Sequence, residues 1–220
     1  MALNFKRSFL FLAVISLLVF SIGCSTMSVS VQKGVPKLQK DAKIAYFKGI
    51  FSDIDFPTFP LLDAALYKNK VKDNINKFKE VEKNSKEQIA AYTAQSIKQK
   101  TGNQVIVTDS PLDANDFYFL DNISTEIEAK IAAECKKVNA AYAFIPVMRV
   151  KVNGVSAFGI TGSNYFESKI YVCDKNGKII GNGYISTESD VMDSADTTRY
   201  QILIKSGEPL LKQLINLLFQ

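Results

Sequence analysis

The sequence predicts an α/β (α+β) sandwich, in which a mixed, mostly antiparallel sheet of about five strands is covered by helices. Short apolar runs that suit strands alternate with longer segments in which apolar residues recur at helical spacing. A tight-turn sequence, Asp174–Gly177, separates two strand-like runs. The chain closes on a leucine-rich amphipathic segment. The expected element order is therefore β-α-α-β-α-β-β-β-α.

The first half of the domain follows from local patterns. The apolar run of residues 43–51 predicts a largely buried strand, and residues 61–83 predict a charged surface helix. Ser85 and Gln88 stand at capping-box spacing, and Gly102 can end the helix that they start. The β-branched run of residues 104–108 predicts the second strand.

The second half begins with a helix, for which Thr125 and Glu128 offer a capping box and which runs to Val138. Three strands follow, at residues 143–153, 165–173 and 178–189. Pro146 should stand at a sheet edge or a bulge because it has no N–H to donate. A last helix starts near Asp196 or Thr197, and we expect it to break near Gly207 and Pro209.

The amino-terminal segment reads as a targeting signal. Lys6 and Arg7 precede an apolar run over residues 9–20, and Ser21-Ile22-Gly23 supplies small residues before Cys24. This pattern is typical of a secretory signal peptide. With a cysteine just past the cleavage point, it resembles a bacterial lipoprotein signal. That resemblance implies cleavage before Cys24, a diacylglycerol group on its thiol and often a further acyl chain, such as palmitate, on the new amine.

These features divide the chain into three parts. Residues 1–23 form the lipoprotein signal peptide, residues 24–40 a polar lipidated tether without strand or helix period, and residues 41–220 a single α/β sandwich domain. Two or more acyl chains hold a protein firmly at a bilayer. We therefore expect a protein of the cell envelope, anchored to a bacterial membrane, the outer more than the inner, with its domain in the periplasm or at the cell surface.

The amino-acid composition excludes several classes of catalytic and binding site. The 220 residues include no histidine, which excludes Ser-His-Asp triads, Cys-His dyads and histidine general bases. We expect no metal and no cofactor. The formal charge of +5 comes mainly from dispersed lysines, so nucleic acid is not an expected partner.

The two remaining cysteines are expected to stay apart. Cys135 continues a helical apolar stripe with Ile127 and Ile131. Cys173 shares a strand face with Glu167, Lys169 and Tyr171, opposite the apolar face. Cysteines on different sides of a sheet cannot reach the short separation that a disulfide requires.

Two short motifs are similar to those of penicillin-recognising enzymes: Ser30 and Lys33 in Ser-x-x-Lys spacing, and Lys100-Thr101-Gly102. Their chemistry needs a serine beside a desolvated lysine, with the second motif on a strand. Here the first motif lies in the expected tether and the second at a helix end. We therefore predict no catalytic centre. The alternative is an envelope hydrolase that uses carboxylates or this Ser-Lys pair.

Aromatic residues gather in two expected loops. Phe56 and Phe59 bracket one loop, and Phe117, Tyr118 and Phe119 fill the other. Partly exposed aromatic side chains favour protein interfaces. These five residues are the candidate partner-binding surface, unless they pack beneath the helices as an extension of the core.

Three features carry a family resemblance: residues 140–145, the strand-turn-strand of residues 170–180 and the amphipathic terminal helix. With them the domain resembles a superfamily that includes the TolB amino-terminal region, the CsgG-like curli-export lipoproteins and the lipoprotein activators of penicillin-binding proteins. This resemblance implies a non-enzymatic role in binding or assembling an envelope complex, through contacts with other envelope proteins. A subunit of an oligomeric CsgG-like outer-membrane export pore is the alternative, and a homo-oligomer stays open.

Overall fold

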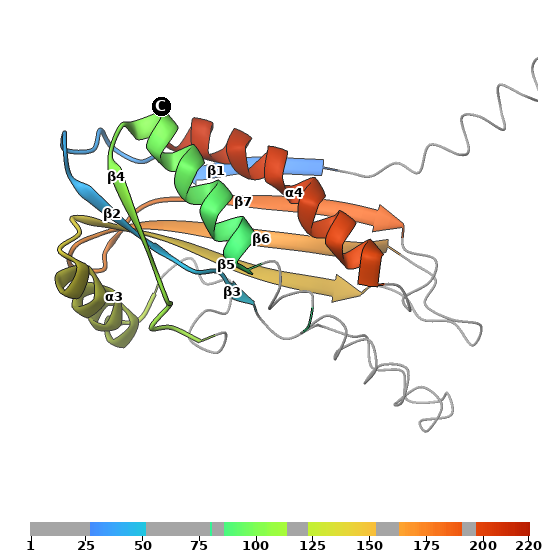
Figure 1. Cartoon of the computed structure of the whole chain (residues 1–220), viewed down its shortest axis with the longest axis horizontal. Helices are drawn as coiled ribbons and strands as arrows, with labels where there is room; N and C mark the ends of the chain where they lie inside the picture. Colours follow the sequence, from blue (N-terminus) through green and yellow to red (C-terminus); the bar gives the residue numbers. More distant parts are fainter. Residues whose placement is uncertain (1–26, 52–79, 81–85, 114–122, 153–162, 191–196) are drawn as a thin grey trace, which may run out of the picture.

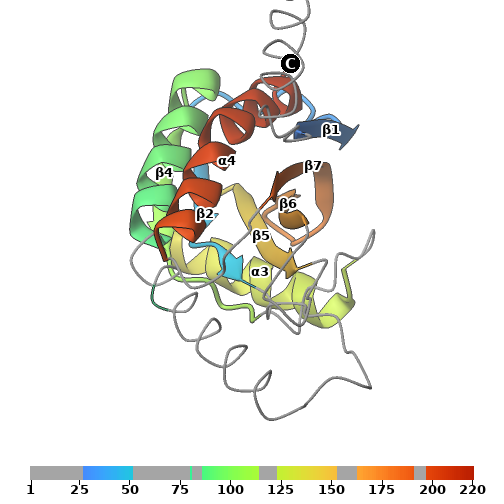
Figure 2. The same ribbon diagram turned by 90° about the vertical axis from the view of Figure 1, so that its right-hand side faces the viewer.

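The computed structural model describes residues 27–51, 80, 86–113, 123–152, 163–190 and 197–220. It confirms the predicted fold class: a mixed, open sheet carries helices on both faces (Figures 1 and 2). Helix α4 (Thr197–Leu218) and the helix of residues 86–101 contribute to the core on one face. Helix α3 (Thr125–Val138) covers the other.

The sheet is half antiparallel and half parallel. Its order is β1-β7-β6-β5-β2-β4, and a short strand β3 also pairs with β5. The pairs β5–β6, β6–β7 and β7–β1 are antiparallel, whereas β2 is parallel to both β4 and β5, and β3 is parallel to β5. The bounds are β1 Met27–Lys33, β2 Lys43–Phe47, β3 Ile50–Phe51, β4 Gln104–Thr108, β5 Tyr142–Val152, β6 Ser163–Asp174 and β7 Ile179–Asp190.

Part of the segment that was expected to be a tether is a strand, β1. Met27–Lys33 pairs antiparallel with β7 as an edge strand, with an irregularity in register between Val31 and Lys33. Val29 and Val31 pack against the α4 side of the core, while Ser28 and Ser30 are exposed. The alternation of serine and valine is therefore the period-two pattern of a half-buried strand. Residues 1–26, with the predicted signal and Cys24, lie outside the described residues.

Two hydrophobic cores hold the layers together. On the α4 side, Leu214, Leu218 and Ile97 pack over Phe144 and Ile170 of the sheet. On the α3 side, a second cluster joins the helix to the opposite face; it includes Ile127, Ile131, Cys135, Ala143, Ile145, Tyr171 and Cys173. The central strands β5 and β6 are therefore buried on both faces.

The helix ends differ in part from the predictions. The cap of α3 is Ser124 rather than Thr125, because the Ile127 N–H donates to Ser124 Oγ at 3.3 Å. Gly102 ends the helix of residues 86–101 as expected, with φ at 73°. Helix α4 runs through Pro209 without the expected break. Its leucine face is packed on the sheet, and that packing offsets the backbone hydrogen bond that proline cannot make.

Pro146 and Gly177 occupy positions that suit their backbone geometry. Pro146 stands in a central strand, but at the gap between β2, which pairs with Tyr142–Phe144, and β3, which pairs with Val147 and Met148. The predicted hairpin turn joins β6 to β7, and Asp174 Oδ1 accepts the N–H groups of Asn176 and Lys178. Of the Asn-Gly pair, only Gly177 has a positive φ, at 85°. The turn is therefore of the longer kind that ends in a left-handed glycine and a bulge.

Candidate binding pocket

Every residue that the sequence predicted as a site lies outside the described residues. These are the lipidation residue Cys24 and the aromatic residues Phe56, Phe59, Phe117, Tyr118 and Phe119. Their roles stay predictions. The candidate site that the described residues do offer is an open pocket that the sequence patterns did not indicate.

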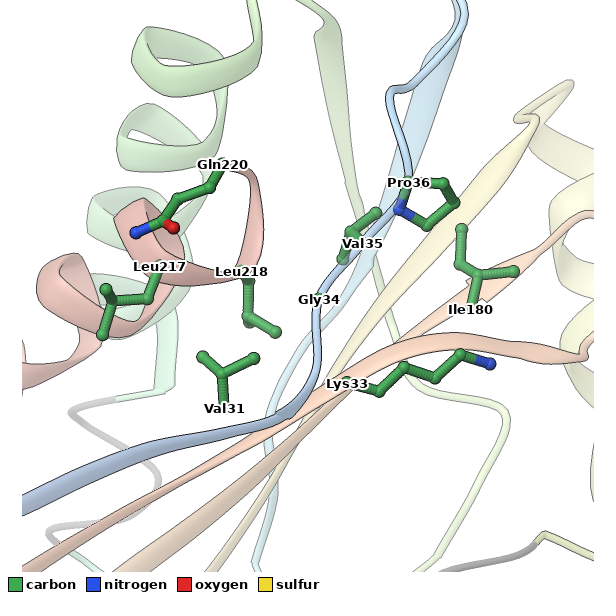
Figure 3. A pocket seen from close by; sticks show the side chains of 9 residues that line it. All are labelled: Val31, Lys33, Gly34, Val35, Pro36, Ile180, Leu217, Leu218 and Gln220. Carbon is green, nitrogen blue, oxygen red and sulfur yellow. The ribbon is translucent and has the colours of Figure 1, made fainter.

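The pocket lies where the end of β1, the chain that leaves it and the end of α4 meet (Figure 3). Its volume is about 680 Å³. The residues that line it are Val31, Lys33, Gly34, Val35, Pro36, Ile180, Leu217, Leu218 and Gln220. One backbone hydrogen bond, from the Val35 N–H to the Leu218 carbonyl oxygen at 2.8 Å, ties the two segments together.

The lining is mainly aliphatic. Val31, Ile180 and Leu217 are partly buried and supply apolar surface, and Pro36 adds a rigid ring. The Lys33 ammonium donates to the Ile179 carbonyl oxygen at 3.0 Å, which holds this cation at the wall formed by β7. An aliphatic pocket with few polar groups suits a hydrophobic side chain or a similarly apolar ligand group.

The pocket joins parts of the sequence that no local pattern connects. Val31 and Lys33 fall in the segment expected to be a tether, and Leu217 and Leu218 in the terminal helix, which the sequence predicted only as a cover for the sheet. The long-range pairing of β1 with β7 brings these segments together. A sign of the first segment was the alternation over residues 28–32.

The motifs that are similar to those of penicillin-recognising enzymes are engaged in local structure. Ser30 lies in β1 opposite Tyr184, and the Lys33 ammonium is bound to the Ile179 carbonyl oxygen. Thr101 Oγ1 donates to the Ile97 carbonyl oxygen at 2.8 Å within its own helix. Among the described residues, no hydrogen bond that we find joins the two motifs.

A polar network lies beyond the carboxyl end of β2. Lys48 Nζ binds Glu87 Oε1 at 2.6 Å and Asp109 Oδ1 at 3.2 Å, and the hydrogen bond to Glu87, then that to Asp109, raises the pKa of Lys48. Because the side chains of Glu87 and Asp109 are 69% and 90% exposed, this network contributes little to stability. Next to it, Thr108 Oγ1 donates to Glu134 Oε1 at 2.6 Å. These contacts tie helices to the sheet.

The prediction that Cys135 and Cys173 lie on different sides of the sheet is wrong. Both side chains belong to the core on the α3 side, and both are fully buried. The face of β6 that was expected to be wet is covered: Lys169 is only 4% exposed, with its ammonium 5.4 Å from the centre of the Tyr171 ring. A polar sequence on one strand face did not mean exposure to solvent, because long side chains bury their aliphatic stems.

The described residues form neither a metal centre nor a membrane-spanning helix. Within the part of the chain that the structure describes, no group of three or more Cys, Asp or Glu side chains is placed to hold a metal ion. No helix in that same part has both the length and the hydropathy that crossing a membrane requires.

Comparisons with known proteins give similar folds only. No protein-family model matches the sequence, and no curated protein matches it. Among solved structures, the PelC dodecamer from Paraburkholderia phytofirmans is similar with a TM-score of 0.46 and 12% identity, over 88% of this chain and 97% of PelC. Lipoprotein GNA1162 from Neisseria meningitidis is similar with a TM-score of 0.36 and 11% identity, over 78% of this chain and 99% of its own.

The hypothetical protein CT253 from Chlamydia trachomatis gives a TM-score of 0.36 and 9% identity, over 79% of this chain and 93% of its own. At these identities and TM-scores, none of the three likenesses carries an argument about what this chain does.

Proposed function

We propose that the chain is a lipid-anchored protein of the bacterial cell envelope that acts without catalysis, as a binding or assembly component of an envelope complex. The observation that carries this proposal is the open aliphatic pocket between β1 and α4. The lipoprotein-type signal before Cys24 supports the location. The absence of histidine supports a role other than the commonest hydrolytic mechanisms.

The position of β1 relates the proposed anchor to the pocket. Met27, the first residue of β1, follows Cys24 by only three positions, which span roughly 10 Å at most. The lipid would therefore hold the start of β1 close to the bilayer. The pocket lies at the other end of the same strand, at Lys33, about 20 Å farther along the sheet.

This arrangement leaves the pocket open to another envelope component while the chain is anchored. We infer that the partner is a protein that inserts an apolar side chain between Val31 and Leu217, since aliphatic pockets accept such anchors at interfaces. The resemblance to the CsgG-like superfamily supports the same class of role, in which lipoproteins build envelope machines through protein contacts.

The first experiment is native mass measurement of the protein extracted from membranes in mild detergent, beside a Cys24→Ser form. A lipid-modified mass that starts at Cys24, with a co-purifying protein, supports the proposal. A ring of identical lipidated chains would favour the export pore instead. An unlipidated chain that keeps its signal would overturn the anchor.

Variants of the pocket test the binding surface separately. Leu217→Asp places a charge in the lining and should remove the co-purifying partner. Asn216→Asp adds the same charge at the neighbouring, exposed position of α4 and should leave the partner bound. Equal loss of the partner from both variants, or from neither, would show that the pocket is not the binding surface.

A further inference from the structure

The buried cysteine pair has no role in the proposed function. Cys135 lies near the end of α3 and Cys173 near the end of β6, and both side chains have 0% exposure in the same core. They are free thiols in this structure. The proposed binding pocket does not include either of them.

The sheet beneath α3 is built for a close approach. Ala45, Ala143 and Cys173 stand opposite one another on neighbouring strands β2, β5 and β6, and all three are fully buried on the α3 side. Because this row carries very small side chains, α3 can lie close to the strands. Small side chains shorten the distance between the helix backbone and the sheet, and hence between Cys135 and Cys173.

Backbone contacts at the two ends of α3 connect the helix to the chain that enters β5 and to the β6–β7 turn. The Ala140 N–H donates to the Cys135 carbonyl oxygen at 2.8 Å, and three residues later Ala143 pairs with Cys173. At the other end of the helix, Gly177 of the hairpin turn lies so close to Glu128 that a β-carbon there would collide with the Glu128 backbone. Helix α3 is therefore held over the end of β6 that contains Cys173.

The ionisation of the thiols agrees with this geometry. Burial raises the pKa of Cys135 to about 11. Burial also raises the pKa of Cys173, and the charge of Cys135 adds to that rise. Since only the thiolate attacks a disulfide, the folded pair reacts slowly.

We propose that a disulfide bond joins Cys135 and Cys173 in the folded protein and forms before α3 closes over the sheet. The thiolate of one cysteine attacks a sulfur of an oxidant of the disulfide class, such as oxidised glutathione or a disulfide-carrying oxidoreductase, and one thiol leaves. The second thiolate then displaces the other thiol. The chain loses two hydrogen atoms, and the oxidant becomes two thiols. This bond requires neither the lipid nor the pocket.

The test uses the full chain with Cys24→Ser, which leaves only the two core cysteines. The chain is unfolded and reduced, then refolded in detergent with a mixture of oxidised and reduced glutathione. We expect a mass lower by two hydrogen atoms and, after trypsin, a linked pair of the peptides 131–136 and 170–175. The oxidised chain should melt roughly 10 °C above the reduced chain.

Single variants provide the control. Cys135→Ala and Cys173→Ala each keep one thiol, so the linked peptides and the dependence of Tm on oxidant should both disappear. A folded chain that retains both free thiols after refolding in the oxidant would overturn the proposal. Counting reactive thiols in the denatured, as-purified Cys24→Ser chain gives an independent answer: none supports the bond, and two contradict it.

Discussion

At the scale of single residues, Tyr46 is unusual because its hydroxyl group is buried in the core. Its ring stacks on Phe144, with centroids 5.8 Å apart, and its side chain is fully buried. Burial raises its pKa, an effect that the neighbouring Thr93 hydroxyl partly offsets. That hydroxyl donates its proton to the Ile89 carbonyl oxygen at 2.7 Å. The Tyr46 hydroxyl is thus left without a hydrogen-bond partner of good geometry among the described residues.

Replacing Tyr46 by Phe should therefore stabilise the protein. An unsatisfied buried hydroxyl costs about 1–3 kcal/mol, so we expect Tyr46→Phe to raise the free energy of unfolding by about 1 kcal/mol, measured in urea. Tyr142→Phe is the matched control, because the Tyr142 hydroxyl accepts the Gln39 N–H at 3.2 Å. That variant should lose about 1 kcal/mol. A loss in Tyr46→Phe as large as in the control would contradict this account.

Substitutions at two glycines distinguish the cost of backbone strain from the cost of a steric clash. Gly177 and Gly102 both have positive φ, at 85° and 73°, but a β-carbon at Gly177 would meet the Glu128 backbone, whereas at Gly102 it would meet nothing within 4 Å. We expect Gly102→Ala to lose about 1 kcal/mol and Gly177→Ala roughly 2–4 kcal/mol of unfolding free energy. Equal losses in thermal or urea unfolding would show that α3 does not press on the turn.

At the scale of elements, local sequence patterns predicted the turns, helix ends and strands that local interactions determine. The hairpin turn at Asp174, the end of a helix at Gly102 and the strands β4 to β7 follow from residue type and period. The capping residue of α3 was missed by one position, because Ser124 and Thr125 are adjacent and both can cap a helix.

What the sequence did not predict depends on distant partners. Strand β1 alternates valine with polar residues, and this weak pattern became a strand only through its pairing with β7. The burial of Cys173 depends on α3, which covers a face that the strand pattern marked as polar. The pocket was missed for the same reason, since it exists only where β1 and α4 meet.

Helix α4 also tests how a helix packs against glycine. A β-carbon at Gly183 of β7 would meet Leu214 Cδ1, so the absence of a side chain there makes room for this leucine. Leu214→Ala should lose about 2–5 kcal/mol of unfolding free energy, because removing the fully buried side chain leaves a cavity. Lys212→Ala, at an exposed position of the same helix, should change it by less than about 0.5 kcal/mol. Similar losses would mean that α4 is not packed on β7.

At the scale of the whole molecule, the proposed anchor fixes an orientation that can be measured. A fluorophore on Ser28→Cys, at the start of β1, should be quenched more strongly by nitroxide lipids than one on Lys37→Cys, beyond the pocket. Both positions are exposed, so neither label disturbs the core. Equal quenching of the two labels in liposomes that carry the lipidated chain would contradict the orientation. The unlipidated chain should show quenching of neither.

The pairing of β1 with β7 also sets the order in which the molecule can be completed. The hydrogen bond from Asn182 to Gln32 joins side chains 150 positions apart, so the strand that is synthesised first waits for one synthesised near the end. Pairings between such distant segments make folding slow, in the range of milliseconds to seconds. Until β7 is synthesised, β1 has no partner strand among the residues that will pair with it. Its backbone N–H and C=O groups can then pair with any other extended chain. In a nascent or translocating chain, this amino-terminal strand is therefore a segment that a chaperone can protect until β7 is available.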